Sequence, residues 1–417
     1  MDNQIRQNLE KYGQTHLLNY LDNLTASEKE NLLSQIGTVD FDVLAKEYAK
    51  VGKEALDSTQ AQISTISSID KESLSKDELD RYYTIGKEEI IAGHIAVVTM
   101  AGGQGTRLGH DGPKGTYVLN VDGGKSLFEI LLDRLKIAEN KFGVKIHWYI
   151  MTSRANNEDT INFFEANNYF GYGKENISFF IQGEIAMLDE KGHILMETNS
   201  SLKLAADGNG GIFEAMHKNG IIDEMKANGV KYVYTCGIDN VLANMVDPVL
   251  IGAMLESGLD IGTKSVEKTD PYEKAGIICM KNGHPAVIEY TEIPDELATL
   301  RKPNGELMYC EMNFVSNIFK LDFLDTLKTN KLPFHIAHKK CDILNVDGSI
   351  EKALTPNAYK FEMFIFDIYE RVNEIFVMRV NRYEEFAPTK NKEGVDSPET
   401  SSKMYKDYWS KIRENKI

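Results

Sequence analysis

Cysteine is scarce in this chain of 417 residues, and its placement is uninformative for pairing. The four cysteines, Cys236, Cys279, Cys310 and Cys341, are scattered, without a Cys-x-x-Cys pair. Small secreted domains instead carry cysteines in a tight framework that disulfides close. The sequence therefore argues against a disulfide-stabilised secreted domain, and a reducing cytosol, hence a cytoplasmic location, is the expected compartment.

Long hydrophobic runs are also missing. No uninterrupted apolar stretch reaches the length of about 18 residues that a membrane-spanning helix needs. The N-terminal sequence Met-Asp-Asn-Gln-Ile-Arg has no basic segment followed by an apolar run, so it does not look like a secretion signal. We expect neither secretion nor a membrane span.

Positive charge is in deficit. The chain has 47 Lys and Arg against 63 Asp and Glu, a formal net charge of −16. Such a balance repels nucleic acids and anionic membrane surfaces at long range. The small groups Lys339-Lys340 and Lys390-Lys392 lie among acidic residues and do not form a nucleic-acid patch. No nucleic-acid or membrane partner is expected, and any phosphate site must gather its cations locally.

The chain has three stretches that differ in composition and hydrophobic pattern. Residues 1–88 are rich in Leu, Lys, Glu and Gln, with apolar positions at helical spacing, which predicts a helical N-terminal region. From residue 89 to 330, β-branched and aromatic runs alternate with amphipathic segments, the pattern of βαβ units. After residue 330 the pattern loosens, so residues 331–417 are expected to form a small C-terminal domain. The predicted fold class is α/β, with a mixed or parallel sheet flanked by helices.

Several elements can be placed by their pattern. A capping box formed by Ser126 and Glu129 opens an amphipathic helix. A second helix is expected around residues 362–371, followed by a polar tail after Asn381 in which residues 388–394 form a loop. Buried strands are predicted at residues 95–100, 146–152, 177–182, 232–237, 275–280 and 314–319.

A glycine-rich loop directly after the first predicted strand is the strongest local signal. It reads Gly-Gly-Gln-Gly-Thr-Arg-Leu-Gly over residues 102–109, and Pro-Lys-Gly follows at 113–115. Ligands of open α/β sheets bind at the carboxyl ends of the strands. Glycines without Cβ atoms let consecutive N–H groups turn toward an anion, and Arg107 and Lys114 add cations. The segment therefore predicts a triphosphate-binding loop.

Two common phosphate motifs do not match this loop. Gly103, Gly105 and Gly109 have the spacing G-x-G-x-x-x-G, whereas the dinucleotide fingerprint needs G-x-G-x-x-G. Lys114 stands between Pro113 and Gly115, so the G-x-x-x-x-G-K-[ST] loop of P-loop nucleotide-binding proteins is absent as well. A dehydrogenase is disfavoured, and a plain glycine turn would leave the two cations unexplained.

The loop resembles the signature of the UDP-sugar pyrophosphorylases, in the eukaryote-type form of the UDP-N-acetylhexosamine (UDP-N-acetylglucosamine) pyrophosphorylases. Further motifs resemble that family in the same order, so that the similarity covers roughly residues 90–390. These motifs lie at residues 148–153, 179–183, 207–211, 238–240, 287–290 and 361–367. The resemblance implies a Rossmann-like nucleotidyltransferase domain with a mixed central sheet.

The resemblance also implies an activity. The expected reaction joins UTP and a sugar 1-phosphate, with N-acetylglucosamine 1-phosphate as the first expectation, to give a UDP-sugar and pyrophosphate with Mg²⁺ as cofactor. A glucose 1-phosphate uridylyltransferase, a broad UDP-sugar pyrophosphorylase and a non-catalytic nucleotide-binding regulator remain as alternatives. The expected partners are the two substrates alone, and the expected state is a monomer or a weak homo-oligomer.

The family's phosphate-handling residues carry over to matching positions. Gly102, Gly103, Gln104, Gly105 and Thr106 would hold the triphosphate through backbone N–H groups. Catalytic cations would be Arg107 near the departing phosphates, Lys114 at the α-phosphorus, and Lys390 from the C-terminal region. Asp239, just past a predicted strand, would bind the metal, although it could instead cap the next helix.

Base and sugar recognition carry over in the same way. Gln182, with Gly208 and Asn209, would recognise uracil, although residues 207–211 taken alone could be a plain turn. Ala206 stands where the family usually has proline.

Glu289 and Asn313 would bond the sugar, and Gly276 would permit its close approach. The family usually reads Asn-Ala-Gly-Asn where this chain has Cys-Glu-Met-Asn at 310–313, which we interpret as a changed sugar wall.

Overall fold

The computed structural model describes residues 3–52, 61–329 and 331–414, and it divides into two compact units. Unit 1 comprises Met1–Gln60, Gly183–Gly211 and Leu332–Phe364, and unit 2 comprises Ala61–Gln182, Ile212–Lys331 and Ile365–Ile417. Each unit thus combines segments that are distant in the sequence. The sequence-based boundaries at residues 88 and 330 follow the chain instead, and they stay a prediction.

Unit 2 is built on a mixed sheet of 11 strands. The strands are β1 Ile63–Ser64, β2 Ile69–Asp70, β3 Ile95–Met100, β6 His147–Thr152, β7 Ile177–Ile181, β13 Tyr232–Gly237, β14 Ile261–Glu267, β15 Ile277–Lys281, β16 His284–Ile288, β17 Glu311–Lys320 and β22 Phe376–Arg379. Their main order is β2-β22-β14-β17-β13-β3-β6-β7, with β15 pairing β1, β16 and β17. β13, β3, β6 and β7 run parallel, whereas β17 is antiparallel to β13 and β14. The mixed central sheet and all six predicted strands are confirmed.

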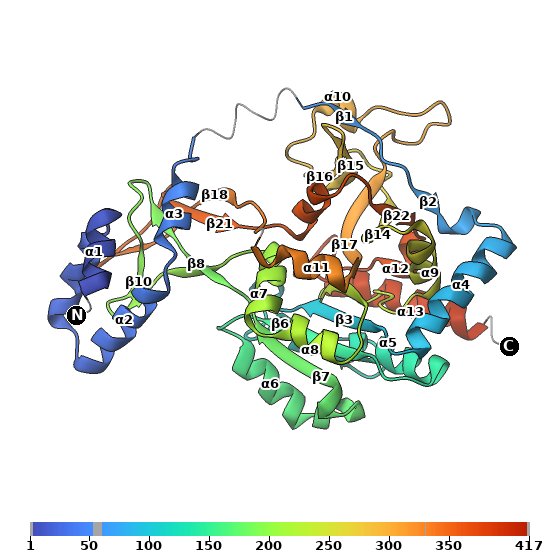
Figure 1. The fold of residues 1–417 in the computed structure, drawn as a ribbon, viewed down its shortest axis with the longest axis horizontal. Helices are drawn as coiled ribbons and strands as arrows, with labels where there is room; N and C mark the ends of the chain where they lie inside the picture. The colour runs from blue at the N-terminus through green and yellow to red at the C-terminus, as the bar shows by residue number, and fades with distance from the viewer. Residues whose placement is uncertain (1–2, 53–60, 330, 415–417) are drawn as a thin grey trace. The chain divides into compact units, whose positions relative to one another are not determined.

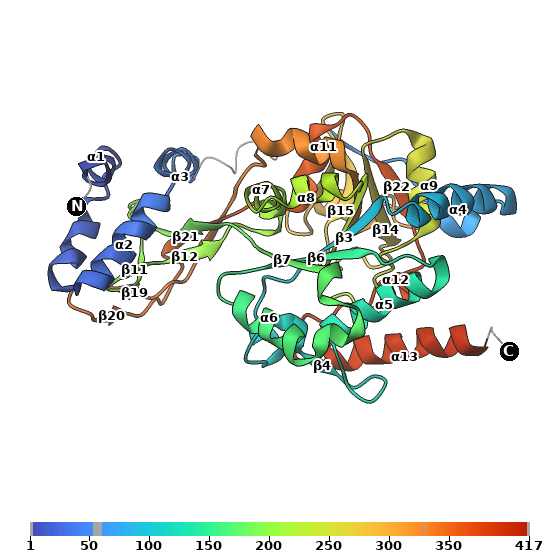
Figure 2. The same ribbon diagram turned by 60° about the horizontal axis from the view of Figure 1, so that its bottom comes forward.

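Helices cover both faces of this sheet, which explains why its central strands are apolar throughout. Figure 2 shows α7 Ile212–Lys218, α8 Ile221–Ala227 and α11 Leu321–Thr326 on one face and α5 Leu127–Phe142, α6 Asn157–Ala166 and α13 Pro398–Glu414 on the other. The remaining helices of the unit are α4 Lys76–Ile91, α9 Pro248–Ser257, α10 Asp295–Ala298 and α12 Arg382–Glu385, and a hairpin joins β4 Val118–Leu119 to β5 Lys125–Ser126. Ile95, Ala96, Val97 and Val98 of β3 are at most 2% exposed.

The ends of α5 follow from its sequence. The hydroxyl of Ser126 accepts a hydrogen bond from the Glu129 N–H at 3.1 Å, which confirms Ser126 as the N-cap; the return bond from the Ser126 N–H to the Glu129 carboxylate, which a capping box requires, is not formed. Gly143, at φ +75°, ends the helix in the left-handed conformation that glycine favours. The helix expected at residues 362–371 is wrong at its start, because Glu362 ends strand β21 (Ala358–Glu362) and a 3₁₀ helix begins only at Ile365.

Unit 1 contains the N-terminal helices, as predicted, and several small sheets (Figure 1). The helices are α1 Asn3–Lys11, the 3₁₀ helix Thr15–Asn23, α2 Ala26–Thr38 and α3 Phe41–Tyr48. β18 (His335–Lys339) pairs with β21, which pairs with β9 (Leu188–Asp189). Three two-stranded sheets pair β8 Glu184–Ala186 with β12 Leu204–Ala206, β10 Met196–Thr198 with β11 Ser201–Leu202, and β19 Ile343–Leu344 with β20 Ile350–Glu351. Leu9, Leu17, Leu32 and Phe361 have no exposed surface and belong to its core.

Within the three described ranges, no helix is long and apolar enough to cross a membrane.

Candidate active site

The glycine-rich loop follows the carboxyl end of β3, and hydrogen bonds from the buried side-chain amide of Asn156 hold its backbone. The Asn156 side chain donates hydrogen bonds to the carbonyl oxygens of Ala101, at 2.9 Å, and Gly103, at 3.3 Å. The Lys114 N–H donates to the Gly103 carbonyl at 3.0 Å and folds the loop back on itself. Among the described residues, no acceptor bonds the backbone N–H of Gly103 or Gln104. These exposed donors are thus available to an anion.

Gln182 lies directly against this loop. A Cβ atom on Gly102 would stand 2.7 Å from Oε1 and 2.8 Å from Nε2 of Gln182, so a side chain there would displace this amide. The Gln182 N–H donates to the Thr152 carbonyl at 2.8 Å, which fixes the chain where β6 and β7 end. Gly103, in contrast, has nothing within 4 Å of its Cβ position. The structure thus brings a predicted base-recognising residue to the predicted phosphate loop.

Lys114 and Asp239 face each other at the carboxyl end of the parallel strands. Lys114 begins a 3₁₀ turn (Lys114–Thr116), and its Nζ lies 3.7 Å from Oδ2 of Asp239, which follows β13. The two side chains are 17% and 24% exposed, so water screens them only partly. Burial opposes the charge on Asp239, but Lys114 and Lys390 outweigh it and hold the pKa of the carboxyl below its ordinary value.

Asp239 does not cap a helix, which was the alternative interpretation. The next helix along the chain is α9, and its cap is Asp247, whose carboxylate accepts from the Val249 N–H at 3.1 Å. Asp239 lies in a turn instead. Its carboxylate is therefore directed by the strand end and by Lys114.

Lys390 reaches the same region from the C-terminal segment. The Thr389 N–H donates to the Asp239 carbonyl at 2.9 Å, so the residue before Lys390 is bonded to the backbone of Asp239. The Lys390 ammonium lies 3.7 Å from Oδ2 of Asp396, and its side chain is 44% exposed. Burial raises the pKa of Asp396, against the effect of Lys390. Lys114, Asp239 and Lys390, which are distant in sequence, are thus assembled at one strand end.

Arg107, the third predicted catalytic cation, does not take part in the interactions of Lys114 and Lys390 with Asp239. It lies on the exposed 3₁₀ turn Thr106–Leu108 of the glycine-rich loop. Within the part of the chain that the structure describes, no carboxylate forms an ion pair with it. Arg107 is close in sequence to the exposed N–H groups of Gly103 and Gln104, but no ion pair joins its side chain to Lys114 or Asp239 among the described residues.

Gly276, Glu289 and Asn313 form a second group: Gly276 directly precedes β15, Glu289 directly follows β16, and Asn313 lies in β17. The Asn313 N–H donates to the Gly276 carbonyl at 2.9 Å, and a Cβ on Gly276 would lie 3.2 Å from Oε1 of Glu289. Next to this group, Val315 adopts φ +57°, which costs energy for a β-branched residue, and the pairing of β14 with β17 shifts register here. The Oδ1 of Asn313 accepts from the Val315 N–H at 3.2 Å and supports the irregular strand.

The side chains of Cys310, Glu311 and Met312 are directed inward, which differs from the expectation that they form a sugar wall. Met312 has no exposed surface, and Cys310 is 2% exposed. Glu311 is ion-paired with Arg379 and accepts a hydrogen bond from Ser68 at 2.6 Å. A strand places successive side chains on opposite faces, and both faces of β17 are covered here, which the motif comparison could not reveal.

Gly208 and Asn209 belong to unit 1, where Gly208 has φ +90° and a Cβ on it would lie 2.3 Å from the Met363 carbonyl oxygen. Asn209 begins a 3₁₀ helix, Asn209–Gly211. The turn is therefore packed against the backbone of the motif at 361–367. The roles of Gly208 and Asn209 at uracil stay a prediction.

Three residues of this region, Asn156, Asn240 and Lys392, were not among those predicted from the sequence. Asn156 holds the glycine-rich loop, and Asn240 bonds the C-terminal segment. The Cδ and Cε atoms of Lys392 lie 3.8 Å from the Cβ position of Gly109, beside the loop. The only sequence signal was that two of these polar residues closely follow apolar strands.

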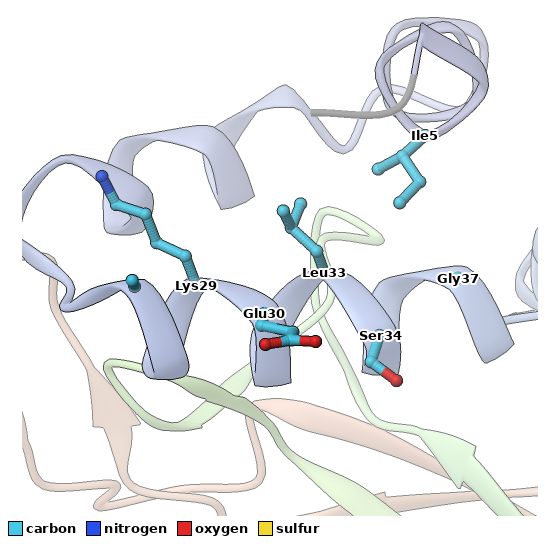
Figure 3. A pocket seen from close by; sticks show the side chains of 7 residues that line it. Ile5, Lys29, Glu30, Leu33, Ser34 and Gly37 are labelled. Atoms are coloured by element: carbon cyan, nitrogen blue, oxygen red, sulfur yellow. The ribbon is translucent and has the colours of Figure 1, made fainter.

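A separate cavity of about 650 Å³ lies in unit 1, between α1 and α2 (Figure 3). Ile5 and Leu33 point into it, and Lys29 and Glu30 lie at its edge. It contains none of the predicted site residues.

A glycine-rich loop with exposed N–H groups, a cation–carboxylate pair and a lysine from the C-terminal segment, gathered at the ends of parallel strands, are the arrangement of the nucleotidyltransferase class of enzymes. The comparisons make this more specific. The family model described as UTP–glucose-1-phosphate uridylyltransferase matches residues 40–406, and the chain belongs to this family of UDP-sugar pyrophosphorylases.

The similar proteins and solved structures are also named as UDP-sugar pyrophosphorylases or diphosphorylases. The chain is 37% identical to the UDP-N-acetylglucosamine pyrophosphorylase of Saccharomyces cerevisiae, over 94% of this chain and 87% of the relative. It is 33% identical to UDP-N-acetylglucosamine diphosphorylase 2 of Arabidopsis thaliana, over 94% and 81%. The crystal structure of the uridine diphosphate N-acetylglucosamine pyrophosphorylase from Trypanosoma brucei superposes with a TM-score of 0.79 at 29% identity, over 95% of this chain and 83% of that one.

Proposed function

We propose that this chain transfers the uridylyl group of UTP to N-acetylglucosamine 1-phosphate, releasing pyrophosphate. The observation that carries the proposal is the assembly of Lys114, Asp239 and Lys390 beside the glycine-rich loop. The relatives named above, which span nearly the whole chain, support the choice of sugar. A cytoplasmic location and a monomer or weak homo-oligomer are part of the same proposal.

The reaction requires positioning and charge neutralisation more than covalent help from the protein. A phosphate oxygen of the sugar substrate attacks the α-phosphorus of UTP, and the bond to the pyrophosphate oxygen breaks in line. The N–H groups of Gly103 and Gln104 bind the triphosphate, with Gly102, Gly105 and Thr106 shaping the loop.

Each of the three cations stabilises negative charge on a different phosphate group. Lys114 stabilises the crowded α-phosphorus, Arg107 the departing phosphates, and Lys390 a phosphate oxygen from the C-terminal side. The Gln182 amide, which lies against Gly102, pairs with uracil.

The second group serves the sugar. The Glu289 carboxylate accepts hydrogen bonds from ring hydroxyls, and Asn313 bonds a hydroxyl or the acetamido group. Gly276 has no side chain and so leaves space for the sugar. A side chain there would also collide with Val287, whose Cγ1 lies 2.7 Å from the Cβ position.

We propose Mg²⁺ as the cofactor, with Asp239 as its protein ligand. Within the described residues, no group of three or more His, Cys, Asp or Glu side chains could hold a metal. One carboxylate nevertheless suits Mg²⁺, which usually keeps several waters and binds substrate phosphates beside one or two carboxylates. The depressed pKa of Asp239 keeps this oxygen ligand ionised. When bound, the ion neutralises part of the triphosphate charge.

The testing experiment measures pyrophosphate release by the full chain. UTP, GTP and dTTP are each offered with N-acetylglucosamine 1-phosphate, with and without Mg²⁺. The proposal predicts release with UTP, dependent on the metal and on the sugar phosphate. Equal rates with GTP would refute the base assignment, and release that continues in EDTA would refute the metal.

The family description offers one alternative, glucose 1-phosphate as the acceptor. It uses the same phosphate residues, so the two candidates differ only at the sugar.

A further inference from the structure

The side chain of Asn240 joins the loop of Asp239 to the C-terminal segment. Asn240 directly follows Asp239 and is 6% exposed. Its Nδ2 donates to the Glu385 carbonyl at 2.7 Å, and its Oδ1 accepts from the Ala387 N–H at 2.9 Å. Both ends of one buried amide therefore bond the same short segment.

Backbone bonds extend this junction toward Lys390. The Val241 N–H donates to the Ala387 carbonyl at 3.2 Å, and the Thr389 N–H donates to the Asp239 carbonyl at 2.9 Å. Asn240 and Pro388 form an antiparallel bridge between these bonds. Lys390 is the next residue after this short ladder, so the ladder's register decides where Lys390 stands relative to Asp239.

The other end of the segment is anchored independently. The Glu385 carboxylate pairs with Nζ of Lys264 at 2.5 Å, and the same ammonium lies 2.9 Å from Asp247. The Lys264 side chain has no exposed surface. Glu385 is therefore fixed in the interior, whereas Lys390, five residues later, is 44% exposed and is held by Asp396, whose carboxylate lies 3.7 Å from its ammonium and whose carbonyl accepts from its N–H at 2.6 Å.

We propose that Asn240 is a positioning residue for the transfer reaction: its amide sets the register of residues 385–389 and so places Lys390 against the phosphates held beside Asp239. An amide is required because one end must donate and the other must accept. Aspartate would put a carboxylate oxygen against the Glu385 carbonyl, and an apolar residue would leave two buried polar groups unbonded. The inference rests on the proposed function, in which Lys390 neutralises phosphate charge.

A double-mutant cycle on the full-length enzyme tests this, with kcat at saturating UTP, sugar 1-phosphate and Mg²⁺ as the readout. Lys390→Met should lower kcat about 10²- to 10³-fold, as expected for losing a preorganised charge contact. Asn240→Ala should lower it about 10- to 100-fold, because small displacements of catalytic groups cost factors of this size. In the Lys390→Met background, Asn240→Ala should cost less than about 3-fold, since the group it positions is gone.

The matched control is Tyr369→Phe, which removes a buried hydroxyl that donates to Thr263 at 3.0 Å, within the same unit. It should change kcat by less than about 3-fold in both backgrounds, as expected for a change away from the site. If Asn240→Ala does not fold, Asn240→Asp keeps the shape and the acceptor for Ala387, and it should show the same coupling.

The possible outcomes distinguish failure of the positioning role of Asn240 from failure of the proposed role of Lys390. Additive losses from Asn240 and Lys390 substitutions, with Lys390→Met itself strongly impaired, overturn the positioning role and leave the proposed function standing. Near wild-type turnover in Lys390→Met overturns both the role of Lys390 in the proposed function and the inference built on it.

Discussion

Replacing Lys114 by methionine tests the phosphate site most sharply. The change keeps most of the side-chain length and removes the ammonium that lies 3.7 Å from Asp239. At an effective dielectric constant of about 20, unit charges about 4 Å apart interact by about 4 kcal/mol. Removal of a preorganised contact to a transition-state charge costs about 10²- to 10³-fold in kcat. We expect a loss in that range, with the fold retained.

The same substitution should move the acid limb of the pH–rate profile. Lys114 is the larger of the two cationic influences that lower the pKa of Asp239 against its burial. Without it the pKa rises, so the carboxylate becomes protonated at a higher pH as the solution is acidified. In the wild type, the stabilisation from ionised Asp239 is present above its unfolded pKa and is lost as pH falls through the lower folded pKa.

Initial rates of pyrophosphate release from pH 4 to 9, beside thermal unfolding, check both effects. Lys125→Met is the matched control, because Lys125 is 23% exposed and pairs at 2.5 Å with Asp133 rather than with Asp239. It should stay within about 3-fold of wild type, as expected for a partly exposed pair. Near wild-type turnover in Lys114→Met, or an unmoved acid limb, would refute the reasoning.

Three further predictions concern the metal, the loop and the buried charges. Asp239→Asn should keep the fold but raise the Mg²⁺ concentration needed for half-maximal rate at least about 10-fold, since one hard ligand is weakened; an unchanged magnesium titration would contradict this. Gly102→Ala should raise KM for UTP because its methyl group would lie 2.7 Å from Gln182, whereas the control Gly37→Ala, outside the site and with nothing within 4 Å, should not; equal KM values in the two variants would contradict the loop geometry. Lys264→Met should lower the free energy of unfolding in urea by about 3 to 5 kcal/mol, because two buried carboxylates lose their buried cation and keep the partly exposed Lys71; a smaller change than about 1 kcal/mol would argue that Lys71 or water compensates.

Much of the fold and part of the site could be predicted because the signals are local. A buried strand such as Ile95–Met100 and a cap such as Ser126 depend on neighbouring residues, and the structure confirms both. The glycine-rich loop could be placed because a strand end and missing Cβ atoms are both visible in a sequence. Lys114 and Asp239 then follow from the parallel order of β3 and β13.

The remainder depends on contacts between distant segments. Two units built from interleaved stretches leave no composition signal, so boundaries drawn along the chain cannot describe them. The inward direction of Glu311 depends on Arg379, which lies 68 residues away in sequence. Asn240 shows the same limit: its motif was visible, but its two bonds to the segment around Glu385 required the folded chain.

The most direct test of the account is kcat/KM for N-acetylglucosamine 1-phosphate and for glucose 1-phosphate at saturating UTP and Mg²⁺. Differences confined to one part of a sugar pocket amount to about 1 to 3 kcal/mol, or about 10- to 200-fold. The account predicts a preference of that size for N-acetylglucosamine 1-phosphate, with UDP-N-acetylglucosamine and pyrophosphate formed in equal amounts. A clear preference for glucose 1-phosphate would contradict it.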